Sequence, residues 1–154
     1  MKKIPLTQGK FALVDDEDFE MVSQYKWSAK ESFPPGTWYA VRYRNKLMHH
    51  LILGESKITD HKDRNGLNNQ RENLRFATAS QNCANRTTCK HSSKFKGVCW
   101  NKQCKKWTAY ISINKKRVHI GYFSDEIEAG KAYDLMAIKL FSEFALTNKN
   151  LGLL

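Results

Sequence analysis

The 154-residue chain has no apolar run approaching the roughly 18 residues that a transmembrane helix needs. It also lacks the apolar stretch of a secretory signal, because the opening MKKIPLTQ is basic and polar. Cysteine is scarce, with only Cys83, Cys89, Cys99 and Cys104. In a chain without a leader these four are expected to be reduced thiols. We therefore expect a cytoplasmic protein with no membrane partner.

Acidic residues are also few. The chain has 15 Asp and Glu against 26 Lys and Arg, which gives a net charge of +11. An excess of this size favours a polyanionic partner, and nucleic acid is the first candidate. A hydrophobic content of 41% excludes a disordered basic tail.

The positive charge is concentrated toward the C-terminus. The net charge is +2 over residues 1–57, +3 over 58–92 and +6 over 93–154. Lys94 to Arg117 contains eight basic residues and no acidic one, interleaved with Phe95, Trp100, Trp107 and Tyr110. Aromatic rings among cations are typical of a nucleic-acid surface, so we expect nucleic acid as the partner.

Hydrophobic periodicity divides the chain into three segments, 1–56, 57–92 and 94–148, which we predict as three domains. In the first two, short apolar runs alternate with polar loops and turn signals such as Asn65-Gly66. The expected elements are strands over 10–14, 38–43, 58–61 and 74–78, and helices over 19–25 and 80–86.

The third segment has the clearest pattern. Residues 106–113 alternate apolar and polar, as in a half-buried strand, with a return strand over 117–123 and a first strand over 95–101. From Asp125 the apolar residues recur at helical spacing, and Asp125 and Glu128 form a capping pair. This predicts a three-stranded antiparallel sheet packed on one helix, with its other face open to a partner.

Polar residues that could perform chemistry lie in the second segment. Asp60 and His61 end its first strand, Asn73 ends the loop, and Asn82 lies on the following helix, which we expect to pack across the hairpin. The oxygens of Asp60 and Asn82 would leave most of a metal's coordination shell open, as Mg²⁺ prefers, with Mn²⁺ an alternative. His61 could take a proton from an attacking water, so the set suits one-metal phosphodiester hydrolysis.

These residues resemble the HNH nuclease family, in the phage and intron homing branch whose third letter is Asn. The matching stretches are 48–53 (MHHLIL), 60–69 (DHKDRNGLNN), 71–78 (RENLRFAT) and 80–82 (SQN). The resemblance implies an α+β fold with a ββα-metal module, and phosphodiester cleavage that leaves 5′-phosphate and 3′-hydroxyl ends. If the chain is phage-encoded, its location would be the host bacterial cytoplasm.

The same resemblance implies a role for each site residue. His61 would be the general base, Asp60 and Asn82 the metal ligands, and Asn73 the side chain that ties the loop backbone. His49 is a possible supporting residue, at a position where the family usually has a His-Arg pair and this chain has His49-His50.

The third segment resembles the plant APETALA/ethylene-response-factor DNA-binding domain. The matching residues include Lys96-Gly97-Val98, 107–111 (WTAYI), 117–123 (RVHIGYF) and Ala132-Tyr133-Asp134. The resemblance implies that the partner is double-stranded DNA and that the sheet lies in its major groove. The implied contact residues are Lys96, Asn101, Lys102, Lys105, Lys106, Tyr110, Ser112, Arg117 and His119.

The sequence thus predicts a site-directed homing-type DNA endonuclease that acts as a monomer or weak dimer. One alternative is a non-catalytic, sequence-specific DNA-binding regulator, and another is a zinc-stabilised RNA-binding protein. The spacings Cys83-x₅-Cys89 and Cys99-x₄-Cys104 are looser than those of the usual zinc knuckles, so structural zinc is not expected.

Overall fold

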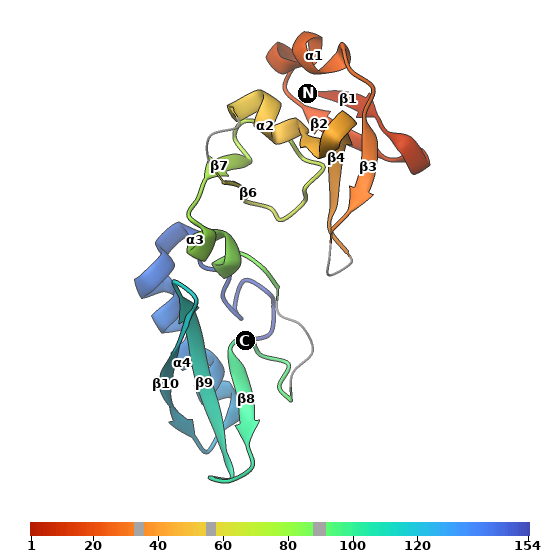
Figure 1. The fold of residues 1–154 in the computed structure, drawn as a ribbon. Helices are drawn as coiled ribbons and strands as arrows, with labels where there is room; N and C mark the ends of the chain where they lie inside the picture. The colour runs from red at the N-terminus through yellow and green to blue at the C-terminus, as the bar shows by residue number, and fades with distance from the viewer. Residues whose placement is uncertain (33–35, 55–57, 88–91) are drawn as a thin grey trace. The chain divides into compact units, whose positions relative to one another are not determined.

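The computed structural model describes residues 1–32, 36–54, 58–87 and 92–154, and it divides into two compact units, 1–77 and 78–154. The fold is mixed α/β with antiparallel sheets (Figure 1). Within the described ranges, no helix has the length and hydrophobicity that a membrane span requires. Cys89 lies outside the described residues. The domain boundaries expected from the sequence stay a prediction.

The first unit is built from three small antiparallel sheets and two helices. The strand β1 pairs with β2, β3 and β5 flank β4, and β6 pairs with β7. The element bounds are β1 (Lys2–Pro5), β2 (Phe11–Val14), α1 (Asp16–Ser23), β3 (Ser28–Glu31), β4 (Trp38–Arg42), β5 (Lys46–Leu47), α2 (Met48–Leu53), β6 (Thr59–His61) and β7 (Leu74–Phe76), with short 3-10 turns η1 (Thr7–Gly9) and η2 (Tyr43–Asn45).

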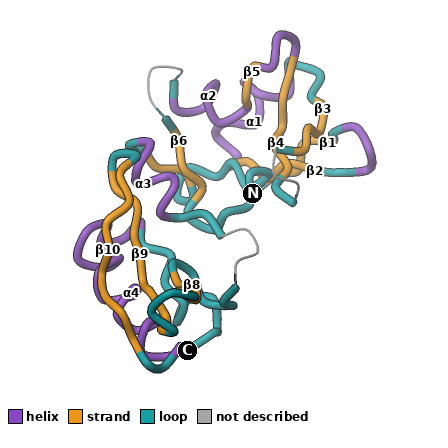
Figure 2. Tube along the Cα trace, turned by 60° about the horizontal axis from the view of Figure 1, so that its bottom comes forward, coloured by secondary structure: helices purple, strands orange, loops and turns teal. Residues whose placement is uncertain are grey.

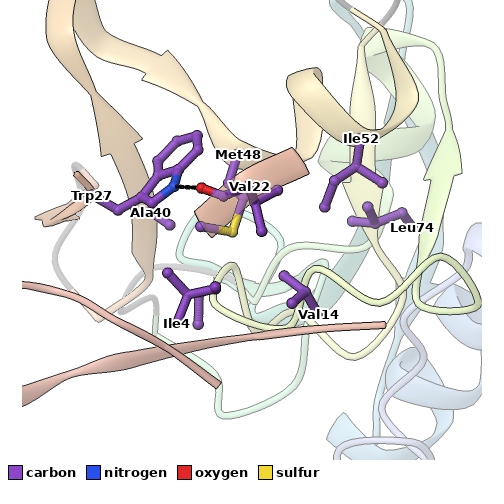
Figure 3. Packing of buried hydrophobic residues seen from close by; sticks show 9 residues of the cluster. Ile4, Val14, Val22, Trp27, Ala40, Met48, Ile52 and Leu74 are labelled. Carbon is purple, nitrogen blue, oxygen red and sulfur yellow. Dashed lines mark hydrogen bonds between the residues drawn. The ribbon is translucent and has the colours of Figure 1, made fainter. Parts of the chain in front are cut away.

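A single core holds these sheets together. Val14, Val22, Trp27 and Met48 are all buried in it, and Leu74 joins it from β7 (Figure 3). The indole Nε1 of Trp27 donates a hydrogen bond of 2.8 Å to the Val22 carbonyl, so the indole is buried with its polar atom satisfied. The segment 1–56 and the strand β7 therefore share one hydrophobic core.

Four elements of this unit were not expected from the sequence, namely β1, β3, β5 and α2. In β1 only Ile4 is buried, and in β3 only Ala29, so neither strand carries an alternating apolar pattern. Their pairing partners hold them in place, because strand formation depends on tertiary context more than on residue type. The first helix also begins earlier than expected, at Asp16, with acidic residues in its first turn.

The second unit contains a three-stranded antiparallel sheet in the order β10–β9–β8, covered by one long helix (Figure 2). The bounds are α3 (Ala79–Ala84), β8 (Val98–Asn101), β9 (Lys106–Ile113), β10 (Lys116–Phe123), α4 (Glu126–Phe141) and the 3-10 turn η3 (Ser142–Phe144). The Asp125 side chain accepts a hydrogen bond from the Glu128 backbone N–H at 2.9 Å, so the expected N-cap is present.

The first strand of this sheet is shorter than the predicted range 95–101. Gly97 adopts a positive φ of 75°, and a Cβ there would lie 2.0 Å from the Tyr133 ring. The chain therefore turns at Gly97 in close contact with α4, and β8 begins only at Val98.

Candidate nuclease site and DNA-binding surface

Asp60 and His61 lie side by side on β6, which pairs with β7 so that Asp60 is opposite Arg75. The guanidinium of Arg75 donates twice to Asp60 Oδ2, from Nε at 2.9 Å and from Nη2 at 2.8 Å. Both side chains are largely buried, at 5% exposure for Asp60 and 12% for Arg75. A buried carboxylate needs such a charged partner, and the two bonds from Arg75 fix the orientation of Asp60.

The loop between β6 and β7 is closed on itself by Asn73. Its Nδ2 donates to Asp63 Oδ1 at 2.9 Å and to the Asn68 carbonyl at 2.8 Å, while its Oδ1 accepts from the Asp63 N–H at 3.0 Å. The Asn73 carbonyl accepts a further bond from the Lys62 N–H at 2.9 Å. These bonds give the polar loop a defined shape next to the Asp60-His61 pair.

A group of rings surrounds His61, which is only 5% exposed. The ring centroid of His49 lies 4.9 Å from that of His61, and the ring of Tyr39 on β4 lies 5.8 Å away. Burial lowers the pKa of His61, while a hydrogen bond with the Asn69 side chain and the Asp63 and Asp60 carboxylates act in the opposite direction. Lowering of the pKa keeps the imidazole neutral at pH 7, the form that accepts a proton.

His49 is also buried, behind His61. Burial, followed by the positive charges that His61 and His50 would carry, lowers the pKa of His49 to about 3. His49 is therefore a neutral packing residue at physiological pH. Its observed contacts are with the rings of Tyr39, His50 and His61.

The N-terminal segment holds the other side of the loop. Leu13 and the loop exchange two backbone hydrogen bonds, from the Leu13 N–H to the Leu67 carbonyl and from the Asn69 N–H to the Leu13 carbonyl, both 2.8 Å. The Arg71 guanidinium donates to both oxygens of the buried Asp18, at 2.9 and 2.7 Å. The β2–α1 segment thus acts as a brace for the loop, a function that no local pattern in the sequence indicated.

Asp15 adds to this brace. Its carboxylate accepts from the Gln70 side chain at 3.0 Å and from the Arg71 backbone N–H at 2.8 Å. These two hydrogen bonds lower the pKa of Asp15, because they favour the ionised form.

The remaining predicted site residue, Asn82, lies half-buried on α3 in the second unit. That helix begins with a capping box, in which the Thr78 hydroxyl accepts from the Gln81 N–H and the Gln81 side chain accepts from the Thr78 N–H. The predicted pairing of Asn82 with Asp60 joins the two units and stays a prediction. Within the described residues, no group of three or more His, Cys, Asp or Glu side chains could hold a metal ion.

The outer face of the β8–β10 sheet carries cations and aromatic rings. Tyr110 lies opposite His119, and Ser112 lies opposite Arg117. The Arg117 guanidinium lies 3.8 Å from the Tyr110 ring centroid, and the His119 ring lies 5.4 Å from that of Tyr110 and 4.6 Å from that of Tyr122. Such stacked cations and rings on an exposed face suit contact with nucleic acid.

The hairpin joining β8 to β9 adds further basic residues. Asn101 Oδ1 accepts from the backbone N–H groups of Gln103 at 3.0 Å and Cys104 at 3.1 Å, so Asn101 shapes this turn. The lysines that follow it are exposed, namely Lys102, Lys105 and Lys106. The hairpin therefore presents three amines to solvent.

Lys96 is a correction to the predicted contact set. It is only 4% exposed, and its amine donates to the Ala84 carbonyl. Its backbone N–H donates to the Asn148 side chain at 2.6 Å. Because the strand starts after the turn at Gly97, Lys96 lies outside the sheet and packs into the unit instead of facing a partner.

Comparison with known proteins agrees with both parts of the chain. This chain is 33% identical to an uncharacterized HNH endonuclease of Acanthamoeba polyphaga mimivirus. The alignment spans 148 residues and covers 92% of this chain and 76% of the viral protein. The chain belongs to the HNH endonuclease family. This similarity supports nuclease activity in general.

The C-terminal part of the present chain matches a second family. Residues 93–143 match the AP2 domain. Over 59 residues the chain is 42% identical to APETALA2-like protein 2 of Oryza sativa, in both subspecies indica and japonica, which covers 37% of this chain and 13% of the rice protein. No solved structure matches significantly. The AP2 match supports DNA binding.

Proposed function

We propose that this HNH family member is a site-directed, homing-type DNA endonuclease that hydrolyses phosphodiester bonds with the help of one divalent metal ion. The observation that carries the proposal is the buried pair on β6, a neutral His61 beside Asp60, whose carboxylate Arg75 holds in place. The finer assignments, a ββα-metal core over 57–92 and a DNA-binding domain over 94–148, belong to the same proposal.

In this proposal His61 removes a proton from the water that attacks the phosphorus. Burial suits that function, because it keeps the imidazole unprotonated and limits its motion. Asn73 contributes by holding the loop that follows His61 in one conformation. The products would carry a 5′-phosphate and a 3′-hydroxyl.

Asp60 and Asn82 would hold the metal ion. The donor set fits a hard divalent cation such as Mg²⁺ or Mn²⁺, since it consists of one carboxylate, oriented by Arg75, and one amide oxygen. When bound, such an ion stabilises negative charge on phosphate and on the leaving oxygen. Its own waters and phosphate oxygens would complete the coordination shell.

Duplex DNA is the proposed substrate, bound by the outer face of the β8–β10 sheet. Lys102, Lys105 and Lys106 would contact phosphates, which contributes affinity without sequence preference. Arg117 and His119, exposed on the sheet itself, are placed to contact base edges if the sheet enters the major groove.

The experiment that tests the proposal is nicking of supercoiled plasmid DNA by the full chain in Mg²⁺. We expect His61→Ala to abolish nicking while DNA binding stays near that of wild type; because Ala leaves a cavity at this buried position, His61→Gln, which fills more of the space, is tested beside it and should also abolish nicking. Asp60→Asn should also abolish it. Its matched control Asp16→Asn, at an exposed carboxylate paired with the N-terminal amine, should leave nicking unchanged.

End chemistry provides the second part of the test. The nicked strand should be extended by a polymerase from its 3′-hydroxyl and resealed by a ligase at its 5′-phosphate. Ends of the opposite polarity would exclude the proposed hydrolysis. DNA binding without any nicking would leave the non-catalytic regulator as the function.

A further inference from the structure

A second cluster of cations and aromatic rings lies on the first unit, at the turn between β4 and β5. We call it the basic tip and define it as Tyr25, Lys26 and residues 42–46 (RYRNK). Arg42 joins its two parts, because its guanidinium lies 4.0 Å from the Tyr25 ring centroid. The tip belongs entirely to residues 1–77 and is separate from the AP2 sheet.

The tip is strongly exposed. Tyr43 has 81% of its surface accessible, and the Arg44 guanidinium lies 5.3 Å from its ring centroid. Within the part of the chain that the structure describes, neither Arg42 nor Arg44 forms an ion pair with an acidic side chain. No acidic side chain among the described residues therefore neutralises these two charges, which are available to a polyanion.

The guanidinium of Arg42 is held by aromatic rings. Its Nε is buried without a hydrogen-bond partner among the described residues, while the guanidinium stacks over Tyr25 and lies 6.0 Å from the Trp27 ring centroid. A cation ordered by ring stacking, and not by carboxylates, keeps its charge for another anion.

The backbone of the tip forms a tight hairpin turn that presents these side chains. Arg44 and Asn45 have φ angles of 59° and 57°, two consecutive left-handed residues that are not glycine. The Lys30 amine donates to Asn45 Oδ1 at 2.9 Å and supports this turn. Tight hairpin turns favour this conformation, so the turn fixes the positions of the side chains that it presents.

The tip and the nuclease site share the strand β4. Tyr39, whose ring is 5.8 Å from that of His61, is on the same strand as Arg42. At about 3.3 Å per residue, the Cα atoms of Tyr39 and Arg42 are about 10 Å apart. Because side chains alternate between the two faces of a strand, Tyr39 and Arg42 point to opposite faces of β4, so the tip would contact a different part of the duplex from the phosphate at His61.

We propose that the basic tip is a second DNA-binding surface, which binds the duplex independently of the AP2 domain. The guanidinium and ammonium groups of Arg42, Arg44 and Lys26 contact phosphates, and the Tyr43 ring packs against a sugar or base. The inference rests on the proposed function, because it takes duplex DNA as the substrate of the first unit.

The test compares two double variants of the full chain. Tyr43→Ala/Arg44→Ala removes one exposed ring and one exposed cation from the tip. The matched control Phe11→Ala/Lys3→Ala removes the same two kinds of group from the exposed β1–β2 pair of the same unit. The probe is a fluorescein-labelled duplex of mixed sequence cut from the plasmid used for nicking, without metal for binding and with Mg²⁺ for nicking.

We expect the tip variant to bind the duplex about tenfold more weakly than wild type, the loss typical of removing a stacking ring and a phosphate contact. The slope of log affinity against log salt should become shallower by about 0.9 for the lost phosphate contact. Nicking should fall at limiting protein and recover at saturating protein. The control variant should match wild type in all three measurements.

Equal affinity and equal salt slope for the tip variant and wild type would overturn the proposal. Arg44→Glu serves as a second variant with the ring intact, and it should weaken binding at least as much. If wild type does not nick but the tip variants still weaken binding, the nuclease proposal fails and the tip stands. If wild type nicks and the tip variants bind normally, only the tip proposal fails.

Discussion

Burial of His49 as a neutral imidazole makes the stability of the first unit depend on pH. The pKa of His49 falls from 6.5 to about 3 on folding. The unfolded chain therefore binds one more proton than the folded chain between these two values. Unfolding becomes easier as the pH drops from 6.5 toward 3, and the stabilisation is fully present above pH 6.5.

The size of this effect follows from the shift. Between pH 7 and pH 5 the protonation of unfolded His49 should lower the free energy of unfolding by about 2 kcal/mol. For a denaturation slope of about 2 kcal/mol per molar urea, the midpoint would shift by about 1 M. His61, whose pKa is also lowered by burial, should add a loss of the same sign.

The assay is urea unfolding of wild type and His49→Gln at pH 7 and pH 5, with hydrogen exchange of the β2 and β4 amides to report on the first unit. His49→Gln should lose about 2 kcal/mol less than wild type between the two pH values. His119→Gln, at an exposed histidine of the other unit, is the matched control and should keep the wild-type difference. Parallel pH dependence in wild type and His49→Gln would refute the assignment of His49 as neutral and buried.

Three substitutions test other parts of the two units. Gly66→Ala should destabilise the first unit by about 1–3 kcal/mol and reduce nicking, because its Cβ would lie 2.5 Å from the Trp38 carbonyl oxygen; thermal unfolding and plasmid nicking measure this. Arg75→Gln should cost about 3–5 kcal/mol and abolish nicking, since it leaves the Asp60 carboxylate buried without its cation. Gly97→Ala should unfold the sheet of the second unit and abolish tight duplex binding, because its methyl group would overlap a ring of α4; circular dichroism and a binding titration follow this.

Each of these substitutions has a control at an exposed position. The controls for the two glycine substitutions are Gly9→Ala and Gly152→Ala, where a Cβ would meet no atom within 4 Å. Gly9 and Gly152 have a positive φ, as Gly97 does, so these controls measure the cost of the backbone conformation without a clash. A larger loss at Gly66 or Gly97 than at the controls is therefore due to the clash. For Arg75→Gln the control is Arg86→Gln, at an exposed arginine. A wild-type nicking rate in Arg75→Gln would show that the orientation of Asp60 has no effect on activity.

Local pattern in the sequence was sufficient for the sheet and helix of the second unit. The range 106–113 predicted from the alternation has the same bounds as β9, although the polar Thr108 is buried, and the Asp125 cap lies where the spacing of Asp125 and Glu128 predicted it. Both features depend on neighbours within a few positions of each other. The family resemblance was likewise carried by short motifs, and the HNH and AP2 matches agree with it.

Long-range pairing decided the rest. Nothing near Lys96 in the chain indicates that its amine reaches Ala84 or that its N–H meets Asn148, so the sequence placed it on the open face. The same holds for the Asp18–Arg71 brace and the Asp60–Arg75 pair, whose members are separated by many residues. Side-chain periodicity records which face of an element is apolar, but only the folded chain brings distant charges together and buries them, and burial sets the protonation of His49 and His61.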